Sequence, residues 1–286
     1  MKKGLFVSAV LCSVMACSPA NAVEKSSIYL LLSGVHPPQQ PQPPYVPPYV
    51  RLVPLNDTGI TGGGSYPSGN NSTCTGEEIG AQDCFHGRDA TKHDNSDGYA
   101  GFSFTKLGHD GVVLANQAVN YAVTPWACVQ DNVTGLTWEV KTSDGGLHDQ
   151  IYTYTWYNTN PAANGGANGE ANSSGNTCKG YVSGNAATYC NTEAYVARVN
   201  AAGWCGKSDW RMPTIKELEG IVSFGTSGPA IDTNYFPNTP PDSVVWSGSP
   251  DAYGLDGAWF VSFYGGHSSH YGRYYYNQVR LVRGGQ

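Results

Sequence analysis

Hydrophobic and polar residues alternate along several stretches of this chain, and this period of two predicts β-strands. Gly-rich turns separate the stretches. Val133-Thr134-Gly135 predicts a hairpin turn, and Tyr264-Gly265-Gly266-His267 predicts a hairpin with a two-residue loop. The strand-like stretches are residues 98–107, 126–140, 244–249, 258–263 and 277–285.

Between the strand-like stretches 126–140 and 244–249, a helical period replaces this alternation. Residues 192–203 contain good helix formers, and Gly203 supplies a stop. Residues 213–225 predict a second helix, in which Thr214 is the N-cap and Glu217 completes a capping box. The order of strands, two helices and strands predicts an α+β fold, with both helices packed on antiparallel sheets and long ordered loops between the elements.

Other segments between these elements lack a clear period. Residues 52–125 predict a β-rich segment that either packs on the main domain or leads into it. The main domain spans residues 126–286. Residues 158–180 are mostly small or turn-forming and predict a surface loop. The stretch 93–98 (HDNSDG) does not fit the register of a calcium loop, so we interpret it as a turn and expect no metal site.

Composition narrows the class of protein. The chain has 286 residues, of which only 13% are charged, with 36 glycines and 19 tyrosines. This composition is typical of an extracellular, turn-rich protein. The net charge of −6 argues against nucleic acid as a partner, because phosphate binding needs a basic face.

The beginning of the chain predicts export. Residues 1–22 read as a signal peptide, with a basic start, an apolar run and an Ala20-Asn21-Ala22 cleavage site. Val14-Met15-Ala16-Cys17 resembles a lipobox and offers an alternative in which Cys17 is lipidated. The Pro-rich residues 23–51 would then be a stiff tether to the outer membrane. The expected location is the cell surface, with a periplasmic or secreted protein as the alternative.

Six cysteines remain beyond this leader, an even number that favours disulfides in an exported protein. Sequence alone does not fix their pairing. We favour two local bonds and one long one, and a zinc site lacks the required spacing. The expected pairs are Cys74–Cys84, Cys178–Cys190 and Cys128–Cys205.

Four motifs carry a resemblance to a known family. They are DNVTGLTWEV, SDWRMPTIKELEGIV, VWSGSP and the final VRLVRGG, at residues 131–140, 208–222, 245–250 and 279–285. Residues 126–286 thereby resemble the C-terminal domain family of the Legionella collagen-like adhesin, although this chain has no collagen-like repeat. The resemblance implies a C-type-lectin-like fold of the formylglycine-generating-enzyme type.

That fold also carries the variable target proteins of diversity-generating retroelements, in which adenine mutagenesis alters a C-terminal stretch. Mutagenesis of an asparagine codon cannot produce Lys, Glu, Gln, Met or Trp. Residues 248–277 contain none of the first four, and their one tryptophan, Trp259, lies in an apolar strand. The resemblance therefore implies a variable receptor-binding site in these residues.

The side-chain chemistry of this stretch agrees with a binding surface. Six tyrosines lie between Tyr253 and Tyr276, with serine and glycine around them. Tyrosine supplies a rigid contact with a polar tip, and small polar residues supply adaptable hydrogen bonds. The alternative is a buried tyrosine cluster. The expected ligand-binding residues are Asp251, Tyr253, Asp256, Tyr264, His267, Ser269, Tyr271, Arg273, Tyr274 and Tyr276.

A second hypothesis about the binding site rests on the positive charge of the last residues. No acidic residue follows Asp256, so Arg273, Arg280 and Arg283 predict a locally basic end that could bind glycosaminoglycans or other glycans. The expected partner is a host, bacterial or phage surface protein or glycan.

Enzyme activity is the weaker interpretation, and we expect neither catalytic residues nor a cofactor. Chemistry of the formylglycine-generating type needs a reactive cysteine pair late in the fold, and the last cysteine here is Cys205. A structural envelope component without a specific ligand is the remaining alternative.

Overall fold

The computed structural model divides the chain into two units, Met1–Leu52 and Val53–Gln286. All of the described residues belong to the second unit. They are residues 55–60, 63–65, 69–71, 88, 97–98, 100–172 and 175–284. None of the helices in these residues is long and apolar enough to cross a membrane. The expected signal peptide (1–22), Cys17, the tether (23–51) and the pair Cys74–Cys84 lie outside the described residues.

One antiparallel sheet holds the beginning of the domain against its end. Its strands follow the order β3-β4-β5-β9, so the last strand of the chain pairs with β5. The turn predicted at residues 133–135 does join two paired strands. The bounds are β3 Phe104–Leu107, β4 Cys128–Asp131, β5 Thr137–Glu139 and β9 Val282–Arg283, and a separate pair is formed by β1 Gly63–Ser65 and β2 Gly69–Asn71.

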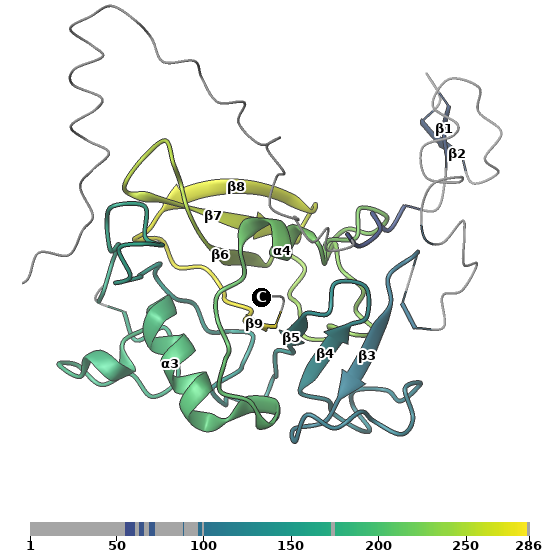
Figure 1. Cartoon of the computed structure of the whole chain (residues 1–286), viewed down its shortest axis with the longest axis horizontal. Coiled ribbons are helices and arrows are strands. Elements are labelled where there is room, and N and C mark those ends of the chain that lie inside the picture. The colour runs from purple at the N-terminus through teal and green to yellow at the C-terminus, as the bar shows by residue number, and fades with distance from the viewer. Residues whose placement is uncertain are drawn as a thin grey trace, which may run out of the picture. The chain divides into compact units, whose positions relative to one another are not determined.

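A second antiparallel sheet contains β6 (Val244–Pro250), β7 (Gly257–Ser262) and β8 (His267–Gly272), with β7 in the middle (Figure 1). The prediction of a two-residue hairpin loop is wrong. Ser262 pairs with His267, so four residues, Phe263 to Gly266, form the loop. The loop is longer because Phe263 turns into the core, where it is fully buried.

The helices begin and end where local chemistry predicts. Helix α3 (Thr192–Ala202) ends at Gly203, whose φ of 66° is the left-handed conformation that glycine adopts readily. Helix α4 (Ile215–Glu219) carries the predicted capping box. It is shorter than the predicted 213–225, although Leu218, Ile221 and Val222 are buried as expected. Two short 3₁₀ helices, η1 (Ala186–Thr188) and η2 (Trp204–Gly206), flank α3.

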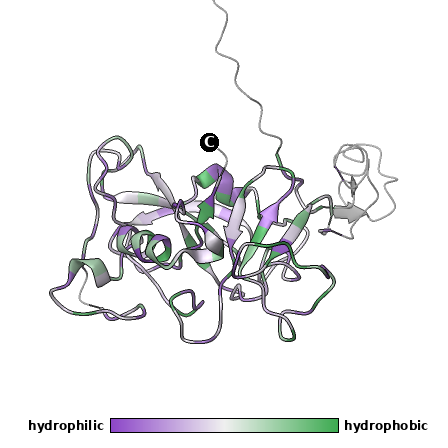
Figure 2. Cartoon of the chain, turned by 60° about the horizontal axis from the view of Figure 1, so that its bottom comes forward, coloured by the Kyte–Doolittle hydropathy of each residue, from purple (hydrophilic) through white to green (hydrophobic). Residues whose placement is uncertain are grey.

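Two hydrophobic clusters form the core. Neighbouring residues of β7 point to opposite sides of the strand, so Val261 joins one cluster and Phe260 joins the other. The second sheet is therefore buried through β6 and β7 but exposed along β8. Figure 2 shows hydrophobic and hydrophilic residues mixed within single elements. Two helices and antiparallel sheets confirm the α+β prediction.

Candidate ligand-binding surface

The expected binding residues lie on β8 and on the turns at both ends of the β7–β8 hairpin. All six residues of β8 pair with β7 without a bulge, from Ser262–His267 to Gly257–Gly272. This regular pairing fixes the strand's backbone while its own side chains remain largely exposed. The hairpin therefore presents side chains from a rigid support.

Eight of the ten expected residues are exposed or partly exposed. Tyr253 is the extreme case, with 98% of its surface accessible, in the turn between β6 and β7. Two further large hydrophobic residues of this region, Leu255 and Tyr275, are exposed and were not among the ten. The eight are Tyr253, Asp256, Tyr264, His267, Ser269, Tyr271, Tyr274 and Tyr276.

Three tyrosine rings form a continuous patch at the end of β8. The ring centroid of Tyr271 lies 4.3 Å from that of Phe260 and 5.3 Å from that of Tyr275. Tyr275 lies 4.6 Å from Tyr274. A hydrogen bond to Tyr275 raises the pKa of Tyr274 above its ordinary value. We call Tyr271, Tyr274, Tyr275 and Tyr276 the tyrosine surface.

Asp251 does not belong to this surface, because it is 93% buried. Its Oδ1 accepts a hydrogen bond from the backbone N–H of Tyr253 (3.0 Å), and its Oδ2 lies 3.0 Å from Nδ1 of His270. Asp251 thus holds the turn between β6 and β7 against β8.

Arg273 is also buried, with 2% of its surface exposed. Its Nε donates to the carbonyl of Gly257 (2.8 Å), and its Nη1 donates to the carbonyl of Ala167. Its guanidinium carbon lies 4.2 Å from the ring centroid of Trp156. Desolvation lowers the pKa of Arg273 from its ordinary value. Arg273 therefore joins the 158–180 loop to the hairpin and offers no charge to a ligand.

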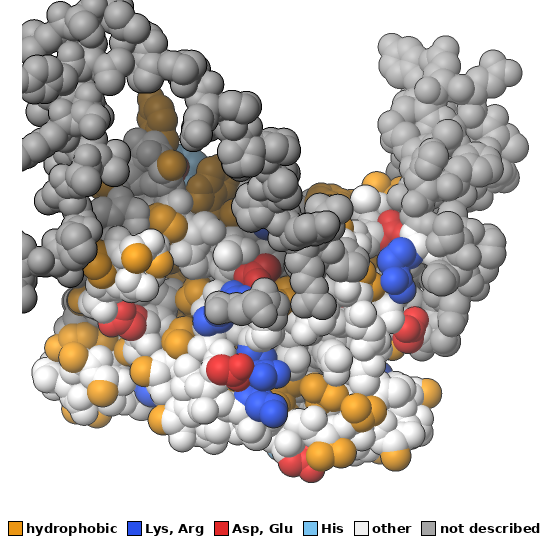
Figure 3. Space-filling model, in the orientation of Figure 1, with side chains coloured by type: hydrophobic (Ala, Val, Ile, Leu, Met, Phe, Trp, Pro, Cys, Tyr) orange, Lys and Arg blue, Asp and Glu red, His pale blue; other side chains and the backbone are white. Residues whose placement is uncertain are grey.

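The basic end expected from the sequence does not form. Arg280 is buried, where its guanidinium donates to the carbonyl of Glu139 (2.7 Å) and to Oγ1 of Thr239 (2.8 Å). Arg283 pairs with Asp209 at 2.7 and 3.0 Å. In Figure 3 most of the visible blue side chains lie against red ones. These arginines are structural, as is Arg211, which binds Glu217 through two hydrogen bonds of 2.8 and 2.7 Å.

A buried polar network is centred on Glu139, and we call it the Glu139 network. The carboxylate of Glu139 accepts hydrogen bonds from Lys141 Nζ (3.0 Å), from the hydroxyl of Tyr195 and from the N–H of Leu281 (2.9 Å). His148 Nδ1 lies 2.8 Å from the same carboxylate. Burial alone would raise the pKa of Glu139, but Lys141 and these hydrogen bonds lower it well below the ordinary value. The network therefore binds the first sheet to α3 and to the last segment of the chain.

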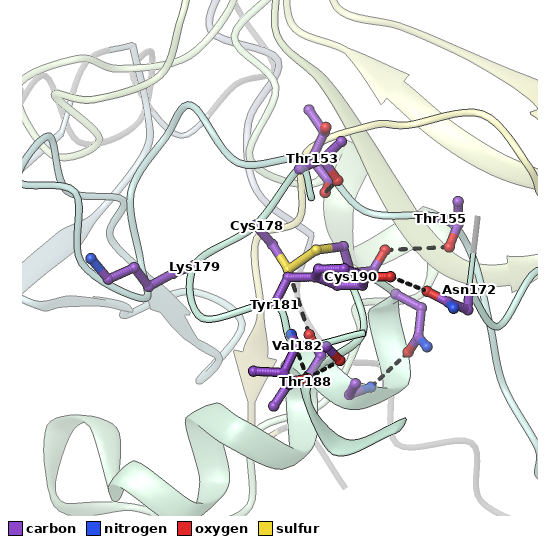
Figure 4. The surroundings of a disulfide bond; sticks show 12 residues. Thr153, Thr155, Asn172, Cys178, Lys179, Tyr181, Val182, Thr188 and Cys190 are labelled. Atoms are coloured by element: carbon purple, nitrogen blue, oxygen red, sulfur yellow. Dashed lines mark hydrogen bonds between the residues drawn. A yellow bond between two sulfur atoms is a disulfide. The ribbon is translucent and has the colours of Figure 1, made fainter. Parts of the chain in front are cut away.

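Two disulfides cross-link this domain, and both pairs were expected from the sequence. Cys128–Cys205 joins β4 to η2 across 77 residues. Cys178–Cys190 closes the end of the 158–180 loop (Figure 4). Around the second bond, Thr155 Oγ1 donates to the carbonyl of Cys190. The four described cysteines are thus all oxidised.

A separate cleft of about 640 Å³ was not visible in the sequence. It lies between the start of the 158–180 loop, the first turns of α3, the segment before α4, and Gly248 of β6. Two of its walls are joined, since Glu193 accepts two hydrogen bonds from Thr159 (2.7 and 2.8 Å). The volume is that of a small-molecule site. Sequence reasoning missed it because its lining comes from four separated segments.

The fold and this surface together describe an α+β domain, cross-linked by two disulfides, that presents an exposed aromatic patch. The chain belongs to the Lcl C-terminal domain family, whose model matches residues 127–283. Family membership indicates an adhesin-like surface protein. Neither the curated proteins nor the solved structures contain a match to this chain.

Proposed function

We propose that this protein is exported, is anchored at the bacterial surface, and binds a surface protein or glycan of another cell or a phage through the tyrosine surface. The observation that carries this proposal is the exposure of contacting tyrosines on β8 and directly after it, where the backbone of β8 is fully paired with that of β7. Exposed aromatic rings contribute large contacts at little cost in side-chain entropy. The leader, Cys17 and the Pro-rich tether support the anchoring.

The proposal includes diversification of this surface by adenine mutagenesis. Its support is that the exposed residues are of types that mutagenesis of an asparagine codon can produce, namely Tyr, His, Ser and Asp. The C-type-lectin likeness stays a prediction of the resemblance. The gene's surroundings provide a direct check. We expect an adenine-rich near-copy of the 3′ end beside a reverse transcriptase gene, and its absence would remove diversification from the proposal.

A fixed basic site for sulfated glycans is not favoured, because two of its arginines are buried and the third is paired. We also propose that the protein is not an enzyme. The four described cysteines in the matched domain form disulfides and so supply no thiol pair for chemistry of the formylglycine-generating type.

The experiment that tests binding uses the purified chain on a glycan array and on intact bacterial cells. Its comparison is Tyr271→Ala/Tyr274→Ala/Tyr276→Ala, and its matched control is Tyr152→Phe at a site away from the surface. We expect the chain and the control to bind at least one probe and the triple variant to lose that binding. Equal binding by all three would contradict the proposal.

A further inference from the structure

The cleft of about 640 Å³ beside α3 is lined by no residue of the tyrosine surface, and its walls are joined to one another. Thr192 Oγ1 donates to the carbonyl of Tyr157 (2.7 Å) and accepts from its N–H (2.9 Å), which ties the loop to α3. Across the cleft, Gly248 of β6 donates its N–H to the carbonyl of Pro213 (2.6 Å). The cleft is therefore formed in advance, which lowers the cost of ordering on binding.

Two of the three charged residues that line this cleft neutralise each other. Arg211 directs Nη1 and Nη2 to the two carboxylate oxygens of Glu217, at 2.8 and 2.7 Å. Glu217 Oε2 also accepts from the N–H (2.8 Å) and the hydroxyl (3.0 Å) of Thr214. This pair adds no net charge to the cleft, and it leaves the guanidinium engaged rather than open to an anion.

The third charged residue, Glu193, keeps its negative charge. Its Oε2 accepts both hydrogen bonds from Thr159, whereas Oε1 has no hydrogen-bond partner among the described residues. In that part of the chain Glu193 also forms no ion pair. It lies in the first turn of α3, where the helix dipole stabilises a carboxylate. The lining of the cleft therefore has a net charge of one negative unit, held at Glu193.

Much of the remaining lining is apolar or aromatic. Val196 of α3 and Met212 before α4 are half-buried there, and Trp156, Tyr157 and Ala163 line the cleft with them. A pocket of this kind fixes a ligand by a few polar groups and holds its body by apolar contact.

The asparagines of the 158–180 loop do not compete with Glu193 as acceptors. Asn158 Oδ1 accepts from the N–H of Asn160 (2.9 Å), and Asn160 Oδ1 accepts from the N–H of Ala162 (3.1 Å). Both oxygens are thus used in turns, which leaves Oε1 of Glu193 as the charged acceptor that a ligand meets.

We propose that this cleft binds a small organic amine, in which an ammonium group is attached to an apolar body. Glu193 is half-buried, so a ligand that fills the cleft displaces water from Oε1 and has to replace the lost hydrogen bonds. An ammonium group does so with a donor of opposite charge, the stronger kind of hydrogen bond. A sulfated, phosphorylated or carboxylate ligand would meet the charge of Glu193 while Arg211 is already paired. The proposal does not rest on ligand binding by the tyrosine surface.

Titration of the purified chain with 2-phenylethylamine tests the class of ligand, followed by protein NMR shifts or calorimetry. The matched probes are 2-phenylethanol, which is neutral, and phenylacetate, which is anionic. We expect the amine to bind at least about tenfold more tightly than either, because the carboxylate distinguishes the three head groups. Equal affinity for the alcohol overturns the proposal, as does the absence of any binding by the amine.

Variants then assign the binding to the cleft. Glu193→Gln keeps an oxygen for Thr159 but removes the charge, and it should weaken amine binding by about tenfold or more. Ala163→Phe leaves Glu193 unchanged and fills the cleft from an exposed loop position, so it should also weaken binding. Glu219→Gln is the matched control, because Glu219 pairs with Lys216 and does not line the cleft.

Melting temperatures near that of the parent chain show that the variants fold. Amine binding that is unchanged in Glu193→Gln or in Ala163→Phe overturns the proposal. Tyr271→Ala/Tyr274→Ala/Tyr276→Ala should bind 2-phenylethylamine as the parent chain does, and a loss in this variant would place the amine on the tyrosine surface instead. The same variant thus distinguishes a failure of the cleft from a failure of the proposed function.

Discussion

Two regions of this molecule use the same kinds of side chain for opposite purposes. In the Glu139 network, Tyr195 is fully buried and donates its hydroxyl to a carboxylate, so its position is fixed by its partners. On the tyrosine surface, Tyr274 is 56% exposed and contacts another tyrosine. The buried tyrosine is thus fixed by its side-chain partners, while the tyrosine surface is supported by the backbone pairing of β8 with β7. A surface built in this way can change its side chains without endangering the fold.

The largest expected effect comes from the network. Glu139→Gln keeps the shape of the side chain but leaves Lys141 buried without its negative partner. We expect the free energy of unfolding to fall by about 3–5 kcal/mol, as measured by urea denaturation. Thr105→Ala in the same sheet removes one exposed hydrogen bond and serves as the control. An unfolding midpoint equal to that of the parent chain would show that the network is not what holds the sheets together.

The second-largest loss of stability is expected from removing the Cys128–Cys205 disulfide. Cys128→Ala/Cys205→Ala should lower the free energy of unfolding by about 2–5 kcal/mol, because the unfolded chain gains the freedom of a large loop. The matched variant, Cys178→Ala/Cys190→Ala, opens a loop of only 12 residues rather than 77. Chain entropy makes the second loss smaller by about 1.6 kcal/mol. The reverse order would contradict this account of the scaffold.

Acid provides a third way to act on the network, and the variant Glu139→Gln separates its effect from that on the other carboxyls. The pKa of Glu139 is lower in the folded chain than its ordinary value of 4.5. A lowered carboxyl pKa contributes stability that is fully present above 4.5 and is lost as the pH falls below it. Each unit of difference contributes about 1.4 kcal/mol. We expect the urea midpoint to fall between pH 5 and pH 3 (roughly the range below the ordinary value), and to fall less steeply in Glu139→Gln. Parallel curves would assign the acid sensitivity to other carboxyls.

Sequence predicted the features that local chemistry determines. The capping box of Thr214 and Glu217 and the stop at Gly203 were correct. Two of the expected disulfide pairs were also correct, although sequence alone does not fix the pairing. The buried positions of Asp251 and Arg273 were not predictable, because their roles depend on contacts such as Trp156, which is distant in the sequence. The hairpin loop was misjudged because tertiary burial of Phe263 overrides the local turn pattern.

The network and the cleft were missed for a related reason. Glu139, His148, Tyr195 and Arg280 come from separate segments, and none has a local spacing that signals their association. Alternation did predict that some of the tyrosine-rich residues near the end would point inward, yet it could not decide which of them. Which side chains face outward depends on the elements that pack against each strand, and these are seen only in the folded chain.

The smallest expected effect on stability belongs to the tyrosine surface, and its measurement tests the central claim most directly. Tyr271→Ala/Tyr274→Ala/Tyr276→Ala should change the free energy of unfolding by no more than about 1 kcal/mol, since surface substitutions usually have small effects. The same variant should lose binding to the cells or glycans that the parent chain recognises. A thermal melt and a binding assay on one preparation decide the matter. Retained binding, or a variant that unfolds, would contradict a binding surface that is independent of the fold.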